Sequence, residues 1–192
     1  MKRLLLLSLA AIMMILTACQ NEGPINGPES PASQKEASFQ PKWISLPQNA
    51  SVKLLKAFNT SEWITIADGG QLTIDETYTS TEGNLVHAYS NIVLAPGCVQ
   101  QDVTISMDID DRTGVSTFLP HQQFNFPAIL NQTFTGLNLT NVDVSNIELY
   151  YYSTDGTWEI MERDDLIIDV ETGTITLVNG KIPHFSVYGY GE

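Results

Sequence analysis

Apolar and polar residues alternate strictly over residues 103–110, and this pattern constrains the fold more than any other feature of the chain. Successive side chains of a β-strand point to opposite faces, so alternation predicts a strand with one buried and one solvated face. The apolar positions are Val103, Ile105, Met107 and Ile109, and the polar positions are Thr104, Ser106, Asp108 and Asp110.

Shorter patterns of the same kind recur along residues 43–192, and turn-forming pairs separate them. The apolar segments are Ile64 with Ile66, Leu72 with Ile74, residues 92–94, residues 147–152, and Ile175 with Leu177. The turn pairs are Gly69-Gly70, Pro96-Gly97, Asp155-Gly156 and Asn179-Gly180. The last pair predicts a type I′ hairpin turn, in which both central residues need positive φ. Many short strands predict an all-β chain with a single antiparallel β-sandwich domain at 43–192, and only residues 52–58 suggest a short helix.

The N-terminus has the pattern of a bacterial lipoprotein signal peptide. Lys2 and Arg3 precede an apolar run at residues 4–16, and Leu16-Thr17-Ala18-Cys19 follows. The run is shorter than the ~20 apolar residues of a membrane-spanning helix. A charged start, a short apolar core and small residues before a cleavage point predict export, with residues 1–18 removed. The position of Cys19 predicts lipidation of its thiol, although an ordinary signal peptide with a chance cysteine is the alternative.

Residues 19–42 are expected to form the lipidated N-terminus and a flexible tether, because their composition is too polar for a core. Gln20 is not the aspartate that marks inner-membrane retention, so we expect a lipid-anchored protein of the cell envelope at the outer membrane. Cleavage would leave 7 basic and 22 acidic residues, a net charge near −15, which excludes nucleic acid as a partner. Lipidation of Cys19 would also leave Cys98 as a free cysteine, which we expect to be buried.

Four segments, in order, give the region from Ile64 to Tyr190 a resemblance to a known domain. They are Leu94-Ala95-Pro96-Gly97-Cys98-Val99 with Asp102-Val103-Thr104-Ile105; Phe118-Leu119-Pro120 with Phe124-Asn125-Phe126-Pro127; residues 150–158; and Ile182-Pro183-His184-Phe185-Ser186-Val187-Tyr188. Together they resemble the ZU-five type domain of zonula occludens proteins and Unc-like netrin receptors. Ala95 and Cys98 depart from its turn motif. The resemblance implies an antiparallel β-sandwich used for interaction and names no common ligand.

In some relatives of that domain, the His-Phe-Ser motif is a site of self-cleavage. Here the motif is His184, Phe185 and Ser186. On a continuous strand, His184 and Ser186 would share a face, so the imidazole could take the hydroxyl proton while the oxygen attacks the Phe185 carbonyl. The competing interpretation is structural: the two polar side chains bond neighbouring loops and Phe185 fills the core.

Two further groups of residues suggest binding. The acidic groups Asp108-Asp110-Asp111 and Glu162-Asp164-Asp165 carry oxygen ligands of the kind that Ca²⁺ prefers, but neither has the spacing of an EF-hand, and solvated loops explain them equally. Aromatic residues near the Asp155-Gly156 turn offer a stacking surface for a sugar or a peptide. They are Tyr150, Tyr151, Tyr152 and Trp158.

The sequence therefore predicts a non-enzymatic module, held to a membrane by lipid on Cys19, that binds a protein or a glycan. The three histidines are far apart, and no metal-ligand spacing or motif of a hydrolase is present, so we expect no cofactor and no metal. The alternative is a self-cleaving domain that uses the motif at 184–186.

Overall fold

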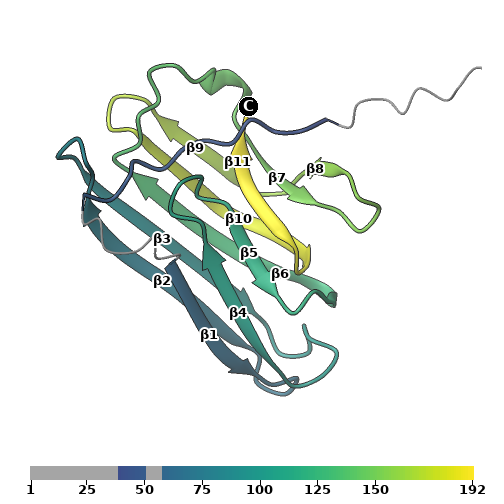
Figure 1. The fold of residues 1–192 in the computed structure, drawn as a ribbon. Coiled ribbons are helices and arrows are strands. Elements are labelled where there is room, and N and C mark those ends of the chain that lie inside the picture. The colour runs from purple at the N-terminus through teal and green to yellow at the C-terminus, as the bar shows by residue number, and fades with distance from the viewer. Residues whose placement is uncertain (1–38, 51–57) are drawn as a thin grey trace, which may run out of the picture. The chain divides into compact units, whose positions relative to one another are not determined.

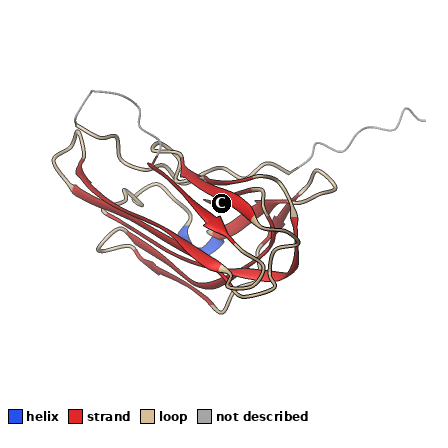
Figure 2. Ribbon diagram, turned by 90° about the horizontal axis from the view of Figure 1, so that it is seen from below, coloured by secondary structure: helices blue, strands red, loops and turns tan. Residues whose placement is uncertain are grey.

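The computed structural model describes residues 39–50 and 58–192, and its strands all lie in the compact unit Ser38–Glu192. They form two antiparallel sheets packed face to face, so the predicted β-sandwich is confirmed (Figures 1 and 2). The six-stranded sheet has the order β1 (Phe58–Ile64), β4 (Val103–Ile109), β5 (Ser116–Leu119), β11 (Val187–Gly191), β7 (Glu148–Tyr152), β8 (Trp158–Ile160). The five-stranded sheet has the order β2 (Gly70–Thr79), β3 (Leu85–Leu94), β6 (Gln123–Thr135), β10 (Thr174–His184), β9 (Asp165–Asp169). One 3-10 turn, η1 (Val144–Asn146), precedes β7.

Strand β4 follows the predicted alternation. Ile105, Met107 and Ile109 are completely buried, whereas the residues between them face outward on the six-stranded sheet. Buried and outward-facing residues also alternate at the start of β2, where Leu72 and Ile74 are buried. Strand β1 ends at Ile64, however, and Ile66 lies exposed in the following turn.

A polar network crosses the otherwise apolar core and joins the two sheets. The Gln132 side chain of β6 donates from Nε2 to the hydroxyls of Ser90 at 3.0 Å and Ser116 at 2.9 Å. Its Oε1 accepts a hydrogen bond from the Tyr190 hydroxyl at 3.2 Å. All four side chains are at most 2% exposed. Because each polar group has a partner, the network adds specific pairing between the sheets without an unsatisfied group.

The segment before the first sheet strand pairs with the end of β11. Lys42 and Glu192 exchange backbone hydrogen bonds at 3.1 Å, and their side chains form an ion pair. The Ile44 amide donates to the Tyr190 carbonyl at 2.9 Å. Residues 42–44 therefore lie beside the C-terminal strand of the domain (Figure 1).

The Asn179-Gly180 pair does not form the predicted hairpin turn, which corrects that expectation. It lies inside β10, where the register with β6 shifts between Leu177 and Gly180. Asn179 has φ of 50°, so the pair supplies the left-handed residue of a β-bulge instead. A Cβ on Gly180 would lie 2.4 Å from the Met161 methyl carbon, so this position needs glycine for close packing. The chain continues as a strand because β6 pairs with β10 on both sides of the bulge.

Several expectations concern residues outside the described ranges. The signal peptide at 1–18, lipidation of Cys19 and most of the tether fall there, as does the possible helix at 52–58 apart from Phe58, which begins β1. Within the described residues, no helix has the length and apolar character needed to cross a membrane. Cys98 is a free, buried cysteine, as expected.

Candidate functional site

The His-Phe-Ser motif forms the connection through which the chain passes from one sheet to the other. His184 ends β10 in the five-stranded sheet, and Val187 begins β11 in the six-stranded sheet (Figure 1). The Phe185 ring is 2% exposed and stacks on Phe118, with ring centroids 5.6 Å apart. It also meets the edge of Phe124 at 4.5 Å. Phe185 thus fills the core where the two sheets are joined.

Two histidines converge on the carbonyl oxygen of Phe185. Nδ1 of His121 lies 3.2 Å from this oxygen, and Nδ1 of His184 lies 3.4 Å from it. Each ring donates a hydrogen bond to the oxygen when its Nδ1 carries the proton. Donors placed in this way stabilise negative charge on a carbonyl oxygen. Sequence reasoning missed His121, because nothing in the local pattern relates it to a peptide 64 positions away.

The Ser186 hydroxyl has a different partner from the one considered in the sequence. It donates to the carbonyl of Tyr152 at 2.6 Å, and no hydrogen bond of the described residues joins it to the His184 ring. His184 and Ser186 would share a face only on a continuous strand, and the chain leaves β10 at His184 and enters β11 at Val187. In this conformation the Ser186 side chain links the connection between β10 and β11 to β7, which agrees with the structural interpretation of the motif.

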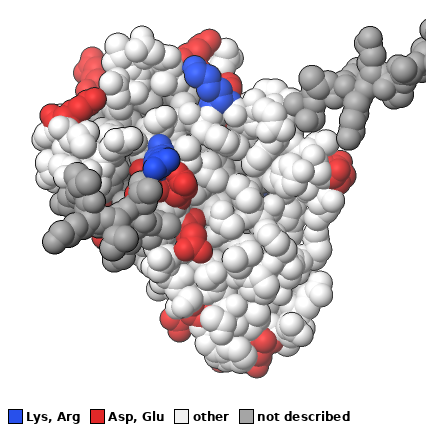
Figure 3. Space-filling model, viewed as in Figure 1, with Lys and Arg blue, Asp and Glu red and all other residues white. Residues whose placement is uncertain are grey.

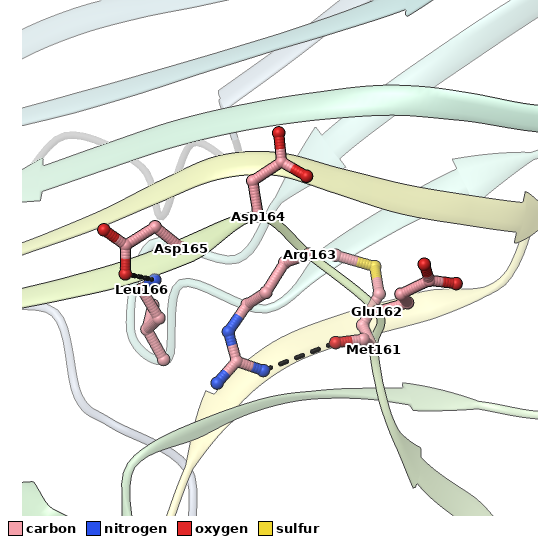
Figure 4. Close-up of a pocket in the computed structure, with 6 residues that line it drawn as sticks. All are labelled: Met161, Glu162, Arg163, Asp164, Asp165 and Leu166. Carbon is pink, nitrogen blue, oxygen red and sulfur yellow. Dashed lines mark hydrogen bonds between the residues drawn. The ribbon is translucent and has the colours of Figure 1, made fainter.

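The acidic group at Glu162-Asp164-Asp165 lines a groove of about 390 Å³ (Figure 4). Each of its carboxylates has a different partner. Glu162 pairs with Lys181, and Asp164 accepts from Nδ2 of Asn179 at 2.9 Å. Asp165 accepts from the backbone amide of Leu166 at 2.8 Å. Across residues 39–50 and 58–192, no cluster of three or more His, Cys, Asp or Glu could hold a metal ion.

Asp110, in the other acidic group, stabilises the turn between β4 and β5. Its Oδ1 accepts from the amides of Arg112 and Thr113, both at 2.9 Å, and from the Thr113 hydroxyl at 3.0 Å. Burial alone raises the pKa of the Asp110 carboxyl, but these hydrogen bonds and the Arg112 charge outweigh it, and the pKa is lowered. The role of this carboxylate is therefore to order the turn.

The tyrosines of β7 alternate between the two faces of their sheet. Tyr151 packs inward, with its ring stacked on Tyr188 at 5.9 Å. Tyr150 and Tyr152 project outward, where Phe39 covers Tyr150 with ring centroids 5.3 Å apart. Tyr152 is 41% exposed and lies 5.0 Å from the ring of Trp158. The outward aromatic side chains thus form a partly exposed surface on the six-stranded sheet.

A groove of about 410 Å³ lies next to this aromatic surface. Its lining comes from the segment before β1 and from β4, β5 and their connecting turn, and consists of Trp43, Asp108, Asp110, Thr113, Val115 and Thr117. Trp43 also contacts Trp158 edge to face, with ring centroids 4.8 Å apart and an interplanar angle of 74°. We call this depression the Trp43 groove.

The Trp43 ring packs on Gly189 of β11, where a larger residue would leave no room for it. A Cβ built on Gly189 of β11 would lie 2.8 Å from the Trp43 ring and 2.9 Å from a Val115 methyl group. The ring therefore rests directly on the backbone of the sheet. The sequence did not single out Trp43 or Thr117, because the groove forms only when residues distant in the chain meet.

Comparison with family models, with curated proteins and with solved structures finds no match to this chain. The geometry of the His-Phe-Ser motif and of the Trp43 groove is therefore the basis for assigning a function.

Proposed function

We propose that this chain is a lipid-anchored, non-enzymatic binding module of the bacterial cell envelope, and that the Trp43 groove receives its protein or glycan ligand. The observation that carries the proposal is the groove itself. It places an aromatic ring and an aliphatic side chain beside two carboxylates and two threonine side chains, so one ligand could find both apolar contact and hydrogen-bond partners there. The resemblance to the ZU-five type domain, a sandwich used for interaction, agrees with this proposal.

In this proposal, lipid on Cys19 holds the module to the outer membrane, and the polar residues after Cys19 act as a spacer. The support is the signal pattern of residues 1–19. Phase partitioning in a cloud-point detergent tests the anchor. The wild-type chain is expected in the detergent phase and a Cys19→Ser variant in the aqueous phase, whereas equal partitioning would contradict lipidation.

Photo-cross-linking in intact cells tests the groove without a prior choice of ligand. A photoreactive residue at Thr117, inside the groove, is expected to give discrete covalent adducts of the full chain. The same residue at Thr77, on the outer face of the five-stranded sheet, is the matched control. Adducts at both positions, or at neither, would contradict a binding role for the groove.

A second candidate function is self-cleavage between Phe185 and Ser186. The observation in its favour is the pair of imidazole nitrogens at 3.2 and 3.4 Å from the Phe185 carbonyl oxygen. The Ser186 oxygen would attack the Phe185 carbonyl carbon, the peptide nitrogen would leave with the hydroxyl proton, and water would hydrolyse the resulting ester. Before attack, the hydroxyl must release the Tyr152 carbonyl to which it donates.

Intact-mass measurement separates the two candidates. Self-cleavage gives a large fragment ending at Phe185 and a peptide of residues 186–192, and Ser186→Ala abolishes both. His121→Ala should slow the reaction if the carbonyl donors contribute. A single uncleaved species that is identical for the wild-type chain and for Ser186→Ala would remove this candidate and leave the binding module.

A further inference from the structure

We infer that the ligand of the Trp43 groove is a neutral oligosaccharide, bound as an extended chain with one sugar ring against Trp43. This inference rests on the proposed function of the groove and specifies the chemical class of its ligand. Three features support it: the fixed aromatic face, the unengaged polar groups beside it, and the row of aromatic rings that leads out of the groove.

The first feature is a rigid aromatic wall. Trp43 rests on Gly189, packs against Trp158 at 4.8 Å and is only half-buried, so part of its indole surface faces the groove. Sugar rings carry an apolar C–H face that packs on such indole surfaces, while their hydroxyls remain available for hydrogen bonds. A ring already fixed in the free protein loses little conformational entropy on binding, which favours affinity.

The second feature is the set of polar groups that the domain itself does not use. The Asp108 carboxylate is half-buried in the groove, and no hydrogen bond or ion pair within the described ranges engages it. Thr117 lies directly opposite Asp108 in the register of β4 and β5, on the same outward face. A carboxylate accepts hydrogen bonds from sugar hydroxyls, and a threonine hydroxyl donates or accepts. Asp110 differs, because its Oδ1 already orders the turn.

The third feature is the continuation of the aromatic surface beyond the groove. Trp43 contacts Trp158, and Trp158 contacts Tyr152 at 5.0 Å. Tyr152 and Ile160, on the same outward face, are 41% and 55% exposed. A row of rings that begins at a shallow groove fits successive residues of a chain better than it fits a single enclosed sugar.

Charge decides between neutral and acidic glycans. The chain has a net charge of −13, and the face in Figure 3 carries acidic side chains with few basic ones. Two carboxylates, Asp108 and Asp110, line the groove itself. This field repels uronic acids, sialic acids and phosphorylated sugars.

Calorimetric titration of the full-length protein in detergent tests the inference. The probes are neutral hexasaccharides of glucose, xylose, mannose and N-acetylglucosamine, with oligogalacturonate as the acidic counterpart and a lysine-rich peptide as the cationic one. We expect saturable binding of at least one neutral probe and none of oligogalacturonate. Trp43→Ala and Asp108→Ala should each weaken binding at least about tenfold, as truncation of central contact residues does.

The matched control is Trp63→Ala. Trp63 is 57% exposed on β1 and does not line the groove. It pairs with Thr104, four residues before Asp108 on β4, so its loss should leave the affinity unchanged. Thr117→Arg fills the groove from an outward position and should abolish binding even if Trp43→Ala fails to fold.

Three results would overturn the inference: no saturable binding of any neutral probe, an equal loss of affinity in Trp63→Ala, or binding of the lysine-rich peptide alone. If groove-specific adducts still form at Thr117 in cells, these results reject the sugar and retain the binding module. If those adducts are also absent, the proposed function fails as well.

Discussion

Replacing Gln132 by leucine tests whether the polar network in the core stabilises the sandwich. Leucine has a similar volume, so the substitution removes the polar groups without opening a large cavity. It removes the hydrogen bonds to Ser90, Ser116 and Tyr190. The hydroxyls of Ser116 and Tyr190 then lose their Gln132 partner in sites that are 1% and 2% exposed.

The expected loss of stability is large because a buried polar group left without a partner costs more free energy than an average hydrogen bond contributes. Each orphaned hydroxyl costs about 1–3 kcal/mol. The Ser90 hydroxyl keeps a contact with the sulfur of Met107 at 3.3 Å, so it contributes less. The leucine side chain is less costly to bury than the glutamine amide, and this difference recovers about 1 kcal/mol of the lost stability. With a central value of about 2 kcal/mol for each of the two hydroxyls and this offset subtracted, we expect Gln132→Leu to lower the free energy of unfolding by about 3 kcal/mol.

Urea unfolding followed by tryptophan fluorescence measures this change, and Tm should fall by about 5–15 °C for a domain of this size. Thr133→Val is the control, because Thr133 is the next residue of β6, faces outward and makes only a 3.4 Å contact with Thr176. In addition, Tyr190→Phe should destabilise the wild-type chain but not the Gln132→Leu variant, since its hydroxyl there has no Gln132 partner. A loss below about 1 kcal/mol in Gln132→Leu, or equal effects of Tyr190→Phe in both backgrounds, would refute the reasoning.

Gly189→Ala should destabilise the domain by about 1–3 kcal/mol through overpacking and shift the fluorescence of Trp43, because the new Cβ would lie 2.8 Å from its ring; an unchanged emission spectrum and Tm would contradict this. The folded-state pKa of Asp110 is lowered from 3.8, so its stabilising contribution is present above that value and is lost as pH falls through the lowered pKa. The Tm advantage of the wild-type chain over Asp110→Asn, measured from pH 7 to pH 2, should therefore shrink with acid, and a constant advantage would count against the assignment. Burial raises the pKa of the Cys98 thiol to about 11, so at pH 8 a thiol reagent should modify Cys98 only after unfolding, and rapid reaction of the native protein would disprove its burial.

The sequence by itself determined those strands in which apolar and polar residues alternate. Alternation over residues 103–109 predicts β4, and the buried positions Ile105, Met107 and Ile109 follow from parity alone. The alternation of the β7 tyrosines was equally readable, since neighbouring residues of a strand must face opposite sides. These predictions succeed because one local property, the two-residue period of a strand, fixes which side chains share a face.

Only the tertiary structure decided how those elements meet. The Asn179-Gly180 pair is compatible with a hairpin turn and with a bulge, and continuous pairing of β10 with β6 selected the bulge. The meeting of His121 with the Phe185 carbonyl, and of Trp43 with Gly189, joins residues from distant parts of the chain. No local pattern encodes such contacts, because they depend on which strands become neighbours when the two sheets bury a common core. The strands were therefore readable from the sequence, whereas both candidate sites exist only in the folded sandwich.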